Sequence, residues 1–417
     1  MYIIRRFPKF CKRFFQKIRR FFGGGGPIFN HVWRIILAIA SLRGRKSLTK
    51  IAALFKGRRT RQAILHCLSK SSWDHKELMR QSALATLKQL GWRPGEPLFY
   101  VIDDTQTEKF GKQMEGVSRI WLHSEKRYAL GHTILLGSIV YRNVVIPYDL
   151  QIWMSEEACQ KVNEKNETQW EFQKLTQLAV KSIESLSFLK SSAVTVLFDK
   201  YYFCQTVVNA CTAMNFNYVA AVKKNRRFTS GGSKRSVGPY SEECIRKAGK
   251  WYDIDGTEQQ HKLAECKGVL SKAGDVKLVF SQRKEEHKIF ILATNNVALS
   301  AKEVVEIYRR RWSIEVLFKM AKQYLGMGDY QFLKLRGVER YLHLVMIAHT
   351  FLTHLALDEL DAQDKQISNI PIRLAGIQQT QARLRENLLL DMLDSLRDNI
   401  SKKLLLQKIR EWYMGTV

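Results

Sequence analysis

The sequence predicts an α/β protein: a mixed β-sheet flanked by helices, with a β-rich insertion and a basic, all-helical N-terminal domain. Two observations support this fold class. Residues 1–95 carry apolar residues at helical spacing, and from residue 97 onwards short apolar runs typical of strands alternate with helical segments. The chain has 417 residues, 45% of them hydrophobic, which is enough for about two or three globular domains.

The chain is strongly basic. Lysine and arginine number 68 against 39 aspartates and glutamates, a formal net charge of +29. Residues 1–70 contain eighteen of these cations and no carboxylate, since the first acidic residue is Asp74. Charge of this size and clustering indicates a polyanionic partner, either nucleic acid or an acidic membrane surface.

Cysteines and hydropathy exclude several classes of protein. The seven cysteines are scattered and form no C-x-x-C pair, so we expect reduced thiols in a cytoplasmic protein rather than a disulfide framework or a zinc site. No apolar run reaches the roughly 18 residues that a membrane span needs, so we expect no membrane-spanning segment.

The first 26 residues form a basic segment of their own. Residues 8–22 fit a helix with an apolar stripe of Phe10, Phe14, Ile18 and Phe21, and the glycines of 23–26 then act as a linker. Such a helix could lie on a membrane surface or against a DNA backbone, and the downstream sequence favours DNA. A basic helical DNA-binding domain is expected over 27–95, with helices at 37–42, 48–55, 61–68 and 76–90.

The following segments alternate between strand and helix patterns. We expect strands at 98–102, 132–141, 144–153, 193–198, 218–222 and 288–293, and helices at 167–186, 203–214, 301–325 and 338–415. A polar, Gly-rich insertion interrupts them at 226–286, with short strands at 251–254 and 276–280. Together with the N-terminal segments, this divides the chain into 1–26, 27–95, 96–225, 226–286, 287–335 and 336–417.

Two of the predicted strands end in aspartate. The strand at 98–102 runs into Asp103 and Asp104, and the strand at 193–198 runs into Asp199. In open α/β sheets, ligand-binding groups gather beyond the carboxyl ends of the strands, so neighbouring strands would bring these carboxylates together. Carboxylates a few ångströms apart repel unless a cation lies between them, and oxygen ligands favour Mg²⁺ or Mn²⁺.

The helix expected at 301–325 carries a second group of charged residues. At about 100° per residue, Tyr308, Arg311, Glu315 and Lys322 fall within an arc of roughly 60°, with Lys319 beside them. One glutamate flanked by cations suits a metal ion that works on a DNA phosphate. An exposed helix face with intrahelical ion pairs is the simpler alternative.

These residues resemble a known family. Tyr308-x2-Arg311-x3-Glu315-x6-Lys322 matches the Y-(2)-R-(3)-E-(6)-K signature of prokaryotic insertion-sequence transposases of the DDE class. The segment Asp103-Asp104-Thr105 with Lys109 downstream is similar to their first-aspartate region. The run from Phe198 to Tyr202 resembles the end of their second-aspartate strand, although Lys200-Tyr201 stands where many relatives have Arg-Gly or Arg-Glu.

The resemblance implies a ribonuclease-H-like core with an insertion between the second aspartate and the glutamate. It also implies a catalytic, metal-binding triad of Asp103, Asp199 and Glu315, since the D-x-[ST] pattern selects Asp103 and leaves Asp104 as the alternative. Two Mg²⁺ or Mn²⁺ ions would serve cleavage at transposon ends and transfer of the 3′-OH to target DNA. The implied partners are terminal inverted repeats, target DNA and a second copy of the chain on DNA, in a prokaryotic cytoplasm.

Further DNA contacts are expected from six side chains of the signature, the helix arc, the first-aspartate segment and the insertion: Tyr308, Arg311, Lys319, Lys322, Lys109 and Trp251. For Trp251 a buried core position is the alternative, and for His132, which opens a strand, a hydrogen-bonded core histidine is favoured over a role near the metal.

Other functions also stay open. These are a catalytically inactive DNA-binding protein of the same fold, a plain ribonuclease-H-like nuclease and a membrane-surface protein.

Overall fold

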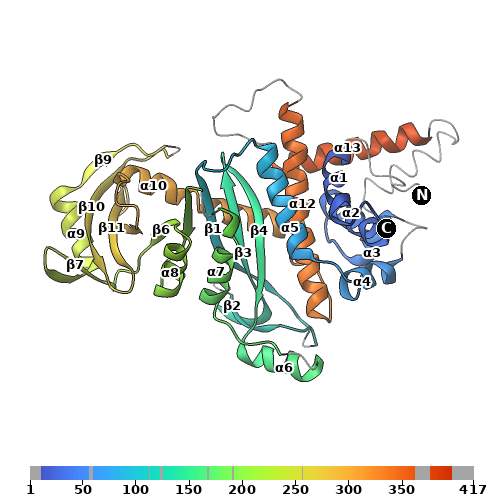
Figure 1. The fold of residues 1–417 in the computed structure, drawn as a ribbon, viewed down its shortest axis with the longest axis horizontal. Coiled ribbons are helices and arrows are strands. Elements are labelled where there is room, and N and C mark those ends of the chain that lie inside the picture. The colour runs from blue at the N-terminus through green and yellow to red at the C-terminus, as the bar shows by residue number, and fades with distance from the viewer. Residues whose placement is uncertain are drawn as a thin grey trace.

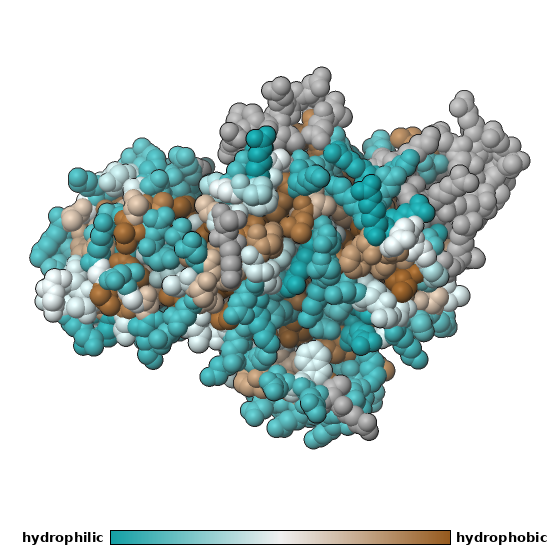
Figure 2. Space-filling view, viewed as in Figure 1, coloured by the Kyte–Doolittle hydropathy of each residue, from teal (hydrophilic) through white to brown (hydrophobic). Residues whose placement is uncertain are grey.

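The structure is a computed structural model that describes residues 11–55, 60–111, 113–122, 125–166, 169–189, 192–255, 257–361 and 376–396. Figure 1 shows a central sheet between a strand-rich insertion at one end and a helical lobe at the other. Residues 8–10 of the first expected helix, and 362–375 and 397–415 of the last, lie outside the described residues. Figure 2 shows that the visible face is covered largely by hydrophilic residues.

Helices from both ends of the chain build the helical lobe. They are α1 (Lys12–Phe21), α2 (Pro27–Ser41), α3 (Leu48–Leu54), α4 (Arg61–Ser69), α5 (His75–Gln89), α12 (Leu335–Asp361) and α13 (Ile377–Leu396). The long helix α12 is the centre of this lobe, because α2, α4, α5 and α13 all contact it. The lobe joins the central sheet where α5 and α12 pack against β4 (Val144–Trp153).

The apolar face of α1 is buried inside this lobe. Phe14 and Phe15 lie against Phe351 of α12, with ring centroids 5.2 and 5.0 Å apart, and both are at most 3% exposed. The apolar stripe therefore packs inside the protein and not on a membrane, which corrects that interpretation, whereas contact of the exposed basic side chains of α1 with DNA stays a prediction. The next helix, α2, is longer than expected because it starts at Pro27, a residue that suits the first helical position.

The central sheet contains β1 (Leu98–Glu108), β2 (Ser118–Leu122), β3 (Arg127–Tyr141), β4, β5 (Val194–Phe198) and β6 (Asn217–Ala221). Its core order is β4-β3-β1-β5-β6, with β3 antiparallel to both neighbours and β1, β5 and β6 parallel. This is the ribonuclease-H-like arrangement that the sequence predicts. The flanking helices are α6 (Glu156–Asn166), α7 (Leu175–Glu184) and α8 (Gln205–Ala213).

The two faces of β1 belong to different layers. Val101 packs in the same apolar cluster as residues of the 301–325 segment, whereas Tyr100 and Ile102 pack with α7 and α8. Because successive side chains of a strand point to opposite faces, Asp103 and Asp104 also point to opposite faces of the sheet.

The insertion extends the central sheet. Its elements are β7 (Arg227–Ser230), β8 (Ser233–Ser236), α9 (Val237–Ala248), β9 (Lys250–Tyr252), β10 (His261–Leu270) and β11 (Gly274–Arg283). β11 pairs with β12 (Ile289–Thr294), which pairs in turn with β6, so one continuous sheet runs from the core into the insertion. The insertion is β-rich as predicted, and α9 is an addition.

The single helix expected at 301–325 is two helices, α10 (Ala301–Arg309) and α11 (Trp312–Tyr324). Between them the amide of Arg311 donates to the carbonyl of Tyr308 at 2.9 Å, and the amide of Ile314 to that of Arg311 at 3.2 Å. These are the tighter bonds of a 3₁₀ turn, which has about three residues per turn. The arc drawn for one continuous helix therefore does not hold across Arg311, which corrects that expectation.

Candidate active site

Strand register brings the two aspartates to one edge of the sheet. In the parallel β1–β5 pair, Val101 lies opposite Leu197. Asp103 and Asp199 each follow two residues later, so they lie side by side where β5 ends, although β1 continues past Asp103 to Glu108 in its pairing with β3. The Asp199 carboxylate is held by the turn after β5, where it accepts a hydrogen bond from the amide of Tyr201 at 2.7 Å.

Arg311 connects Glu315, the third acidic residue, with Asp103 at this edge of the sheet. Its guanidinium donates to Asp103 at 2.7 Å and, through its other terminal nitrogen, to Glu315 one turn further along the same segment. The capping box of Ser300 and Glu303 fixes the start of α10, and the 3₁₀ turn places Arg311 between α10 and α11. Asp103 and Glu315 thus share one cation.

Asp103 lies in an environment that disfavours its charge. Burial raises its pKa to about 7, and although Arg311 opposes this shift, the nearby Asp104 and Asp199 add to it. Only 17% of the Asp103 side chain is exposed. Like charges crowd this end of the sheet, and a further cation would stabilise their ionised forms.

Asp104 differs from Asp103 in its partner and its face of the sheet. The hydroxyl of Tyr202 donates to it at 2.6 Å. Burial raises the pKa of Asp104, while this hydrogen bond opposes the rise. Tyr202 belongs to the run after Asp199 that resembles the family, but its contact with Asp104 was not foreseen, because it depends on strand register.

The oxygen donors of this edge suit a hard divalent cation such as Mg²⁺ in their chemistry. Arg311 occupies the position between Asp103 and Glu315, and in the part of the chain that the structure describes no three acidic, histidine or cysteine side chains are close enough to hold a metal ion together. The donor chemistry of Asp103, Asp199 and Glu315 therefore suits a divalent metal, whereas their spacing here, with Arg311 between two of them, does not.

Comparison with protein families adds an independent observation. The sequence profile described as DDE superfamily endonuclease matches residues 33–272, more than half of the chain. The chain belongs to this superfamily. None of the curated proteins compared with the chain matches it. The matched region contains Asp103 and Asp199 and ends before Glu315, and endonucleases of this superfamily generally use divalent metals.

The other expected DNA-binding residues of this DDE superfamily endonuclease lie on the same two helices as Arg311 or next to them. Tyr308 is 9% exposed, and its ring lies 5.5 Å from that of Phe290 on β12. The Arg311 guanidinium lies 5.8 Å from the Tyr308 ring centroid. Lys319 and Lys322, further along α11, have exposed side chains. Tyr308 is thus buried next to Arg311, and Lys319 and Lys322 continue along α11 as exposed cations.

Lys109 is not positioned as an exposed DNA contact. It is 6% exposed, and its ammonium donates to the carbonyls of Gly328 at 2.6 Å and Tyr330 at 3.2 Å. We therefore remove Lys109 from the DNA-binding set. This lysine instead fastens the segment that connects α11 to α12 onto the end of β1.

His132 lies in the core of the protein, whereas Trp251 lies on its surface. His132 is fully buried, with one ring nitrogen 2.8 Å from the Tyr330 hydroxyl and the other 3.0 Å from the Glu115 carbonyl. It is the hydrogen-bonded core histidine that the sequence favours. Trp251 on β9 is 47% exposed, so the buried alternative for this residue is wrong.

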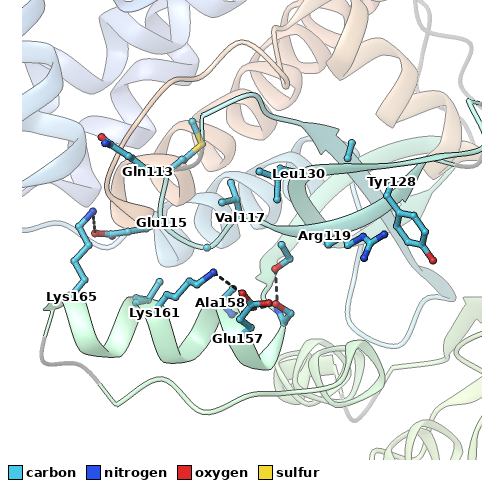
Figure 3. A pocket seen from close by; sticks show the side chains of 16 residues that line it. Gln113, Glu115, Val117, Arg119, Tyr128, Leu130, Glu157, Ala158, Lys161 and Lys165 are labelled. Carbon is cyan, nitrogen blue, oxygen red and sulfur yellow. Dashed lines mark hydrogen bonds and ion pairs between the residues drawn. The ribbon is translucent and has the colours of Figure 1, made fainter.

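A groove lies away from the carboxylates, between β2 and α6 (Figure 3). Its volume is about 640 Å³, and each of its two carboxylates pairs with a lysine. Lys161 contacts Glu157 at 2.6 Å, and Glu115 contacts Lys334 at 3.0 Å and Lys165 at 3.9 Å.

Among the described helices, none combines the length and apolar character that crossing a bilayer demands.

Proposed function

We propose that the chain is a DNA transposase that cleaves phosphodiester bonds at the ends of a mobile element and joins the freed 3′-OH to target DNA. One observation carries this proposal. Asp103 of β1 and Glu315 of α11 are far apart in the sequence, yet Arg311 contacts both at the sheet edge where Asp199 also lies. The spacing of Tyr308, Arg311, Glu315 and Lys322 adds support, because it matches the transposase signature without a gap.

Asp103, Asp199 and Glu315 would hold two divalent ions, Mg²⁺ or Mn²⁺. Bound there, the ions supply a nucleophile at neutral pH and stabilise the entering and leaving oxygens of the phosphoryl group. The raised pKa of Asp103 supports this assignment, since it indicates a carboxylate in need of more positive charge. Asp104 points to the other face of the sheet and accepts from Tyr202, which favours Asp103 as the ligand.

Cations around the carboxylates would bind the DNA backbone. Arg311, once displaced from Asp103 and Glu315, would contact a phosphate together with the Tyr308 hydroxyl. Lys319 and Lys322 would contact phosphates further along the strand. The net charge of +29 supports duplex DNA as the partner, and a dimer that pairs two element ends is our expectation for the assembly.

The test uses the DNA that flanks this gene. We expect short inverted repeats there, and duplexes that contain them should be cut by the purified chain in Mg²⁺ and joined to a second duplex. Glu315→Gln and Asp199→Asn should reduce cutting by about a hundredfold or more and leave binding largely intact. Glu306→Gln is the matched control, since Glu306 lies on α10, where it pairs with Lys302 at 3.7 Å and accepts from the amide of Asp255 at 3.3 Å.

Each result separates the proposal from its alternatives. Cutting without joining would indicate a plain nuclease, and binding without cutting would indicate an inactive DNA-binding protein. Cutting that persists at the wild-type rate in both carboxamide variants would contradict the assigned triad.

A further inference from the structure

A second cavity adjoins the carboxylates. Its volume is about 520 Å³, and it lies between the insertion and the α10–α11 segment. Tyr308 and Arg311 form part of its wall, so it is continuous with the site described above. The opposite wall comes from β10, β11 and β12, through His261, Ser281 and Phe290 among others.

The wall of this cavity is predominantly positive. Four cationic side chains line it against a single carboxylate, that of Glu286. Glu286 already pairs with Arg283 at 2.9 Å. Lys288 is exposed, and in the described part of the chain its ammonium has no hydrogen-bond or ion-pair partner. The cavity therefore attracts an anion and offers it a cation that no carboxylate neutralises.

His261 provides a buried polar group with an unused position. The side chain is 6% exposed, and its Nδ1 lies 2.9 Å from the Ser281 hydroxyl, whereas its Nε2 has no hydrogen-bond partner. A buried polar nitrogen without a partner is costly, so such an atom on a cavity wall indicates a ligand. If the Ser281 hydroxyl donates to Nδ1, the imidazole carries its proton on Nε2 and can donate to an anionic oxygen.

We propose that this cavity binds a backbone phosphate of the DNA strand, next to the phosphodiester that reacts at the carboxylates. His261 donates to this phosphate from Nε2, and Lys288 neutralises part of its charge. The exposed rings of Phe290 and Trp312 at the same cavity contact the adjoining deoxyribose or base, as aromatic residues do in strand-binding grooves. The inference rests on the proposed function for its substrate, and it assigns to the insertion the task of positioning the strand.

The inference is tested by duplex binding without metal. The probe is a fluorescein-labelled duplex of about 30 base pairs in EDTA, and its anisotropy is followed with increasing salt. Lys288→Ala should weaken binding by about three- to tenfold and reduce the slope of log K against log salt by about 0.9, because one phosphate contact no longer releases a counterion. His261→Gln should weaken binding by a similar factor with little change of slope, since a neutral imidazole releases none.

Lys284→Ala is the matched control. Lys284 is also exposed in the β11–β12 connection, but it does not line the cavity. Binding by this variant should stay within about twofold of wild type. Equal losses for Lys284→Ala and Lys288→Ala, or an unchanged slope for Lys288→Ala, would overturn the inference. If His261→Gln unfolds, Ser281→Ala tests the same pair, because it removes the group that orients the imidazole.

The result is independent of catalysis. Binding is measured in EDTA, so a chain that never cuts DNA still passes or fails this test. Conversely, normal binding by Lys288→Ala and His261→Gln would leave the triad of Asp103, Asp199 and Glu315 untouched.

Discussion

The groove between β2 and α6 and the carboxylate edge of the sheet differ in how their charges are balanced. The groove is the larger hollow, at about 640 Å³, but its acids each contact a lysine. At the carboxylate edge Asp104 and Asp199 raise the pKa of Asp103, Asp199 also raises that of Asp104, and Arg311 is the cation that contacts Asp103. Unbalanced charge, rather than the size of a hollow, therefore marks the place where a cation and a polyanion would bind.

The largest expected effect separates the two adjacent aspartates of this edge. Asp103→Asn should lower the DNA cleavage rate by about a hundredfold or more, because it removes a proposed metal ligand on the face shared with Glu315. Asp104→Asn should lower it by about tenfold or less, since Asp104 acts through Tyr202. Single-turnover cleavage of the flanking-repeat duplex measures both. The reverse order of effects would make Asp104 the ligand.

Lowering the pH should destabilise the protein through His132, whose ring contacts the carbonyl of Glu115 at the groove. Burial lowers the pKa of His132 to about 4, while an unfolded histidine titrates near 6.5. Between these values the unfolded chain binds more protons, so the free energy of unfolding falls as the pH drops from about 6.5 to 4. His132 contributes a loss on the order of 3 kcal/mol over this window.

The control for this prediction is His132→Gln. Glutamine cannot titrate, so the thermal midpoint of this variant should depend less on pH between about 6.5 and 4 than that of the wild type. Lys109, which also lowers the His132 pKa, and Tyr330, which contacts the ring, are unchanged in the variant. Parallel curves for the two proteins would show that His132 does not govern the acid response.

The smallest expected effect lies in the groove itself. Lys161 and Glu157 form an exposed ion pair one helical turn apart, with 70% and 75% of their side chains exposed. Lys161→Ala should change the free energy of unfolding by about 0.5 kcal/mol or less and leave DNA cleavage unaffected. Chemical denaturation and the cleavage assay check this. A clear loss of cleavage would place DNA in the groove and remove the contrast between the two regions.

Strand positions were well predicted where the pattern is local. The hairpin of β3 and β4 turns at Arg142 and Asn143, which both have positive φ, as an asparagine-containing two-residue turn requires. The strand β4 has the bounds 144–153 that the sequence predicts. In contrast, α6 was missed because only Ala158, Cys159 and Val162 of this polar helix are buried, which leaves a weak apolar pattern.

The candidate site depends partly on contacts that no local pattern encodes. The choice between Asp103 and Asp104 needs the phase of β1, which pairing with β3 and β5 establishes. The break between α10 and α11 contains no proline or glycine from which it could be predicted. Lys109 is buried because the segment around Gly328, far along the chain, folds over it.

The helical lobe has a consequence for synthesis on the ribosome. α1 and α2 are translated well before α12, the helix that buries their aromatic side chains, which begins only at Leu335. Until α12 has been synthesised, the apolar faces of α1 and α2 lack this packing partner. All strands of the central sheet have been synthesised by then. Folding therefore includes a late docking of α1 and α2 onto α12, and a chain stopped before α12 would leave these two helices exposed to chaperones and proteases.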